Sequence, residues 1–166
     1  MAVKEQHAAP SIVNQDAVDP SAGYDTDFFQ WTQATAEMIR QGRLAEVDLE
    51  HVAEEIEDMG KRDRREVRSR LIVLVMHLLK WEFQPERRTP SWRSTIDEQR
   101  MQIELILLDS PSLRRLPSDE LDATYKRAIN RAVTQTGLNK NRFPPSCSYT
   151  LEQILDVAFV PEPHSN

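Results

Sequence analysis

The 166-residue sequence has one cysteine and no long apolar run, and each of these two scarcities excludes a class of protein. Because Cys147 has no second cysteine to pair with, an internal disulfide is impossible, which excludes a disulfide-built secreted module. The longest apolar stretch, residues 71–79, is interrupted by His77 and is shorter than the ~20 residues of a membrane-spanning helix. Residues 1–23 contain no apolar stretch of signal-peptide length. We therefore expect a cytoplasmic protein with no membrane partner.

Neither sign of charge dominates, and no stretch shows the pattern of a strand. The 21 Lys and Arg residues stand against 27 Asp and Glu, so the net charge of −6 excludes a uniformly basic coat. Two-residue alternation with β-branched enrichment is missing, whereas apolar residues recur every three or four positions. The sequence predicts an all-α, single-domain helical bundle over residues 24–160. Residues 1–23 are expected to form a flexible tail and residues 161–166 a frayed C-terminus.

Capping residues and apolar spacing predict four or five main helices and a short C-terminal helix. Helix starts are expected at Asp25 or Thr26, at Asp48, at Ser91, near Ser118 and at Thr150, where Gln153 completes a capping box. Helix ends are expected at Gly42, at Ser110 and at Gly137. Residues 48–83 are one long helix or two helices broken at Gly60, since glycine costs about 1 kcal/mol in a helix interior.

Residues 71–79 are apolar on every side of a helix, apart from His77. A helix that is apolar all round is a buried one, so this segment is predicted to be the central helix of the bundle. The other helices each carry a single apolar stripe, as outer helices do. The stripe of the segment that opens at Asp48 is expected to face the core; it consists of Leu49, Val52, Ile56 and Met59.

Charged residues are grouped by sign on one segment. Residues 44–60 hold seven acids and no base, and residues 61–70 hold six bases and two acids. One interpretation is a basic patch that binds nucleic-acid phosphates, formed by Arg62, Arg65, Arg87, Arg88 and Arg93. The other is that the acidic part pairs with basic surface elsewhere in the bundle or in a second copy. We prefer the second, because nucleic-acid affinity follows the net local charge and the neighbouring acids reduce it.

A weaker candidate is a metal site formed by His51, Glu54, Glu55 and Asp58. These residues share a helical face, and imidazole with carboxylates is a legitimate ligand set. Their mean direction, however, is opposite the apolar stripe of the same segment, whereas metal sites in bundles project inward and use Glu-x-x-His, which this chain lacks. We expect no resident metal and no cofactor.

His77 and Lys80 are polar residues set in or beside the segment predicted to be buried. They suggest an enzyme in which His77, Lys80 and a carboxylate such as Glu57 line a pocket between helices. The alternative is a histidine at the core edge, bonded to a carbonyl, with a lysine that reaches water. We prefer the alternative, because no phosphate loop, dinucleotide fingerprint, zinc spacing or nucleophile elbow accompanies the pair.

Several motifs together resemble the bacterial domain-of-unknown-function 29 family. They are Tyr24-Asp-Thr-Asp-Phe-Phe-Gln-Trp31, the segment 48–60, His77-Leu-Leu-Lys-Trp81, and the segments 84–88, 91–100, 110–112 and 143–155. The resemblance spans about residues 24–162, nearly the whole predicted domain. It implies a small helical domain, and it implies no reaction, ligand or catalytic residue.

The function these observations favour is a non-enzymatic protein-interaction or regulatory module that self-associates. The absence of a catalytic signature and the adjoining acidic and basic blocks support it, since two such segments in antiparallel pairing would match opposite charges. A nucleic-acid-binding protein that uses the basic region 61–100 and an enzyme that uses His77 and Lys80 are the alternatives.

Overall fold

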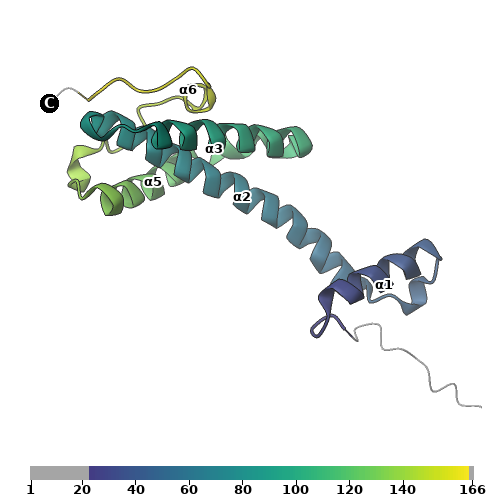
Figure 1. Cartoon of the computed structure of the whole chain (residues 1–166). Coiled ribbons are helices and arrows are strands. Elements are labelled where there is room, and N and C mark those ends of the chain that lie inside the picture. The colour runs from purple at the N-terminus through teal and green to yellow at the C-terminus, as the bar shows by residue number, and fades with distance from the viewer. Residues whose placement is uncertain (1–22, 165–166) are drawn as a thin grey trace, which may run out of the picture. The chain divides into compact units, whose positions relative to one another are not determined.

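The computed structural model describes residues 23–164, and the chain divides into two compact units, residues 1–57 and 58–166. We call them the N-terminal unit and the C-terminal unit. The described residues contain six α-helices, four short 3-10 helices and no strand (Figure 1). The all-α prediction is confirmed. The expected tail lies outside the described residues except for Gly23, and so do residues 165–166.

The N-terminal unit contains helix α1, Phe28–Arg40, the 3-10 helix η1, Leu44–Glu46, and the start of α2. The cap of α1 is Asp27, whose carboxylate accepts the Gln30 amide at 2.9 Å, so the start predicted at Asp25 or Thr26 is wrong by one or two residues. The predicted stop at Gly42 is confirmed. Gly42 has a φ of +73°, and the next amide donates to the Met38 carbonyl at 3.0 Å, as in a Schellman motif.

Helix α2, Leu49–Phe83, runs through Gly60 without a break (Figure 1). Asp48 accepts the His51 amide on its side chain at 3.2 Å and the Val52 amide on its carbonyl at 3.1 Å, so the chain enters the helix at the predicted residue. Of the two possibilities for residues 48–83, the single helix is therefore the observed one. Long flanking stretches of good helix formers outweigh the cost of one glycine.

The described part of the C-terminal unit contains the rest of α2 and four further α-helices: α3 (Pro90–Asp109), α4 (Leu116–Asp119), α5 (Leu121–Thr136) and α6 (Leu151–Leu155). Three short 3-10 helices connect them: η2 (Pro85–Arg87), η3 (Pro111–Arg115) and η4 (Lys140–Arg142). Helix α3 is capped by Thr89, which accepts the Trp92 amide, and not by Ser91 as predicted. The region expected to start near Ser118 is divided into α4 and α5. Gly137, with a φ of +72°, ends α5, and the predicted capping box opens α6.

The second half of α2 is the centre of the C-terminal unit, with α3 and α5 beside it (Figure 1). Seven of the nine side chains in residues 71–79 are buried, and only Val73 and His77 are partly exposed. The core contributed by the neighbouring elements consists of Ile96, Ile103, Tyr125, Ala128, Ile129, Ala132, Phe143, Tyr149 and Ile154. The prediction that residues 71–79 form the central helix, with His77 at its edge, is confirmed.

The C-terminal segment lies against this core, where the sequence predicts a frayed end. Pro161 is buried, and the His164 amide donates to the Glu82 carbonyl at 3.0 Å. Tyr149 also donates to the Glu82 carboxylate. The chain is therefore held in place at least as far as His164.

One packing prediction is wrong. Leu49, Ile56 and Met59 are 57%, 64% and 68% exposed, although their spacing is that of a buried stripe. Within the N-terminal unit, the packed side of α2 is instead the one that carries His51 and Glu55, which contact Tyr24. No helix among residues 23–164 combines the length and apolar content of a membrane span.

Candidate functional site

His77 lies at the edge of the core and lines a groove of about 550 Å³ between α2 and α5. Its Nδ1 is 2.9 Å from the Val73 carbonyl oxygen, which can only accept, so Nδ1 carries the proton and Nε2 keeps a lone pair. Burial lowers the pKa of His77, and the nearby Lys80 lowers it further. The imidazole is therefore neutral at pH 7, and the histidine bonded to a carbonyl matches the preferred interpretation of the sequence.

Lys80 is buried, which corrects the expectation that it reaches water. Only 8% of the residue is exposed; Nζ donates to Gln135 Oε1 at 2.9 Å and lies 4.3 Å from the centre of the Trp92 ring. Desolvation lowers the pKa of this amine. In the part of the chain that the structure describes, neither His77 nor Lys80 has a carboxylate bonded to it, and Glu57 belongs to the N-terminal unit. A catalytic role of His77, Lys80 and Glu57 stays a prediction.

The five candidate arginines of the phosphate patch have different roles. Arg88 donates from Nε to the Trp81 carbonyl at 2.9 Å and stacks 5.0 Å from the centre of that ring. Arg93 pairs with Asp97 at 3.0 Å and also donates to the Val157 carbonyl at 2.8 Å. The remaining three, Arg62, Arg65 and Arg87, are exposed.

The basic block is also partly neutralised inside the C-terminal unit. Arg68 and Arg64 both pair with Glu120, and Arg70 pairs with Glu66 at 2.6 Å. The hydrogen bond from Arg68 is the main cause of the lowered pKa of Glu120. These pairs do not involve the acidic run 44–60, so the predicted pairing of that run with basic surface stays a prediction.

The metal candidates are engaged in other contacts. His51 Nδ1 lies 2.7 Å from Asp48 Oδ2, a hydrogen bond that raises the pKa of the histidine and lowers that of the aspartate. Glu55 accepts the Tyr24 hydroxyl at 2.6 Å, which raises the pKa of Tyr24 to about 12. Asp58 pairs with Lys61 at 2.9 Å. No group of three His, Cys, Asp or Glu side chains among residues 23–164 is placed to hold a metal ion, and Glu54 belongs to no such group.

An aromatic cluster holds the N-terminal unit together. The Tyr24 ring lies 4.1 Å from the His51 ring and 4.9 Å from the Trp31 ring, measured between centres, and Phe28 stacks on Trp31 at 5.6 Å. Tyr24 contacts both Trp31 of α1 and His51 of α2, whereas Leu49 and Ile56 of α2 are exposed. The side of α2 that meets the cluster is thus not the side that the apolar stripe predicts.

Most of the large apolar side chains in residues 23–57 are not buried. Within these described residues of the N-terminal unit, the buried large apolar side chains are Trp31 and Val47. Six others are exposed, and we call them the N-terminal apolar face: Phe28, Phe29, Ile39, Leu44, Leu49 and Ile56. Large exposed apolar patches are typical of surfaces that bind another molecule.

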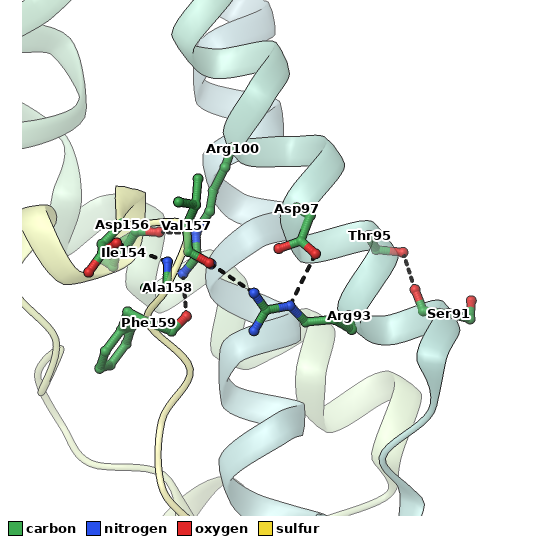
Figure 2. Close-up of polar contacts among 10 residues, drawn as sticks. All are labelled: Ser91, Arg93, Thr95, Asp97, Arg100, Ile154, Asp156, Val157, Ala158 and Phe159. Atoms are coloured by element: carbon green, nitrogen blue, oxygen red, sulfur yellow. Dashed lines mark hydrogen bonds and ion pairs between the residues drawn. The ribbon is translucent and has the colours of Figure 1, made fainter.

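Arg100 is a functional candidate that the sequence analysis missed. It projects from α3 toward the segment after α6, is 2% exposed, and donates from Nε to the Ile154 carbonyl at 2.8 Å and from Nη2 to the Phe159 carbonyl at 2.9 Å (Figure 2). Nη1 is buried and has no acceptor. A signal was present, because position 100 continues the buried stripe of Ile96 and Ile103, where a charged residue is unexpected.

The fold and these sites define a helical protein of two small units that presents an apolar surface and a buried arginine. The family model for the domain of unknown function DUF29 matches residues 24–160, and the chain belongs to this family. A search of curated proteins and a search of solved structures found no match.

Proposed function

We propose that the protein is a non-enzymatic interaction module that self-associates through the N-terminal apolar face. The observation that carries the proposal is that residues 23–57 expose six large apolar side chains and bury two. Such a surface is costly in water and is stabilised when a partner covers it.

The spacing on α2 indicates that the partner is a helix. Leu49, Val52 and Ile56 stand at intervals of three and four, as the a and d positions of a coiled-coil heptad do. Val52 is half-buried and the other two are exposed, so the seam is open to a second helix.

Charge favours a second copy of this chain in antiparallel orientation. The acidic run includes the exposed Glu50 and Glu54, and the basic run includes the exposed Arg62 and Arg65. In an antiparallel pair, the acidic run of one copy meets the basic run of the other, whereas a parallel pair would place like charges together.

The alternative functions have less support. Arg88 and Arg93 of the phosphate patch are used for contacts within the C-terminal unit, and His77 and Lys80 have no carboxylate bonded to them in the described structure. The six side chains of the apolar face are exposed among the described residues of the unit, and this exposure favours an interaction surface.

Sedimentation equilibrium over a range of protein and salt concentrations tests the proposal. We expect a reversible dimer whose dissociation constant rises with salt. Ile56→Glu should raise that constant by about 100-fold, because the site occurs twice in the dimer and each apolar side chain contributes about 1.5 kcal/mol.

Met101→Glu is the matched control, because Met101 is 47% exposed on the other unit; this variant should dimerise like the parent chain. A protein that stays monomeric at high concentration and low salt would refute self-association. A dimer that Ile56→Glu leaves unchanged would refute this face as the interface.

A further inference from the structure

The C-terminal unit contains a cavity of about 490 Å³ beside α3, which we call the Arg100 cavity. Its volume is within the range of roughly 300–1,000 Å³ that small-molecule sites occupy. Five apolar side chains line it, and they are Ile103, Leu107, Leu108, Leu155 and Val157. An apolar cavity of this size favours an apolar ligand, and the charged groups around it determine which kind.

Arg100 lines the cavity, and no carboxylate among the described residues is hydrogen-bonded to its guanidinium, although Asp97 and Asp156 act on its charge. Its bonded acceptors are backbone carbonyls, which are neutral. Nη1, in a residue that is 2% exposed, has no acceptor at all. A buried N–H group without a partner is costly, so such a group in a native structure calls for an acceptor from outside the chain.

Two further charges complete the cavity. Arg114 of η3 is an exposed cation on its lining, and Glu104 of α3 is an exposed carboxylate. The exposed guanidinium of Arg114 offers a ligand a charged partner, and a planar carboxylate fits the fork of a guanidinium.

We propose that the Arg100 cavity binds a small amphipathic carboxylic acid. The carboxylate takes the acceptor role toward Arg100 Nη1 and Arg114, and the hydrocarbon part packs against Ile103, Leu107 and Leu108. The cavity lies wholly in the C-terminal unit, so this inference is independent of self-association through the N-terminal apolar face.

Isothermal titration of the full chain with octanoate, and with 1-octanol as the neutral analogue of equal chain length, tests the proposal. We expect saturable binding of octanoate, with 1-octanol bound at least about tenfold more weakly, because it gives the guanidinium groups no charged acceptor. No saturation by octanoate at millimolar concentration, or equal binding of the two compounds, would overturn the proposal.

Variants of exposed lining residues locate the site without disturbing the core. Leu108→Glu places a carboxylate at the apolar wall and should weaken octanoate binding by about tenfold or more, and Arg114→Gln should weaken it by about fivefold. The matched controls are Leu105→Glu and Arg115→Gln, which alter exposed neighbours outside the lining and should bind like the parent chain. If all four variants bind octanoate like the parent chain, the acid binds elsewhere and the proposal is wrong.

Discussion

Replacing Arg100 with methionine tests how the segment after α6 is held. The guanidinium donates to the carbonyls of Ile154 and Phe159 at 2.8 and 2.9 Å, and the residue is 2% exposed (Figure 2). Methionine fills most of the volume of the side chain but donates no hydrogen bond. The substitution therefore removes these two bonds and the longer one from Nη2 to the Gln153 carbonyl at 3.5 Å.

The expected loss of unfolding free energy follows from these bonds. A hydrogen bond from a charged donor contributes about 1.5–3 kcal/mol, so the two bonds sum to about 3–6 kcal/mol. Removing a buried cation that has no bonded carboxylate gives part of this back, since burying a charge costs several kcal/mol. We expect Arg100→Met to lower the free energy of unfolding by about 3 kcal/mol.

Urea unfolding followed by circular dichroism measures this loss, and Arg93→Met is the matched control. Arg93 lies on the same helix and donates to Val157 of the same segment at 2.8 Å, but its side chain is 36% exposed. Because water competes for an exposed donor, Arg93→Met should cost less than about 1 kcal/mol. Equal costs for the two variants, or a loss below about 1 kcal/mol for Arg100→Met, would refute the view that the buried arginine anchors this segment.

The remaining predictions concern two glycines, one ion pair and one histidine. Gly60→Ala should raise the free energy of unfolding by about 0.5–1 kcal/mol, because Gly60 lies in a helix interior and an added Cβ meets no atom within 4 Å. Gly137→Ala should lower the free energy of unfolding by about 1 kcal/mol, because the φ of Gly137 is +72°. The urea midpoints of the two variants check this contrast. Glu120→Gln should reduce the loss of stability in acid. The Arg68 contact lowers the pKa of Glu120, so the pair stabilises the fold above the unfolded pKa near 4.5, and this contribution disappears as the pH falls further. If the stability of Glu120→Gln in urea falls like that of the parent chain between pH 6 and about pH 3, this prediction is wrong. His77 should titrate below 6.5 and show a protonated Nδ1 in nitrogen NMR, and a charged ring at pH 7 would contradict its assignment as a neutral residue at the core edge.

The parts of the fold that local chemistry determines were predictable. Thr150 and Gln153 form a capping box from residues three apart, and Gly42 and Gly137 end helices because glycine adopts a left-handed conformation without strain. The burial of residues 71–79 was predictable as well, because a helix that is apolar on every side is stable only when other elements surround it.

The exposed stripe on α2 could not be predicted from its spacing. Leu49 and Ile56 repeat with the period of a buried face, and periodicity identifies a face without identifying what covers it. Tyr24 contacts His51 and Glu55, which are far from it in the sequence. Apolar spacing within one helix does not predict such a contact.

Arg100 and Lys80 show the same limit in the C-terminal unit. Both stand among apolar residues at helical spacing, which suggests that they are special but does not identify their partners. Those partners are carbonyls some fifty residues away for Arg100, and the Gln135 amide with the Trp92 ring for Lys80. Long-range polar contacts of this kind arise only once the helices are assembled.

The choice of main-chain oxygens as the acceptors for Arg93 and Arg100 affects how the sequence of residues 154–159 can change over time. Every amino acid supplies the same carbonyl, so the hydrogen bonds from the two arginines do not themselves depend on side-chain identity in this segment. Related chains can therefore change Ala158 and keep the same attachment to the two arginines, whereas Asp156 also accepts the Ala158 amide on its side chain at 2.9 Å and Val157 lines the Arg100 cavity. An insertion or deletion there would be far more damaging than any single exchange.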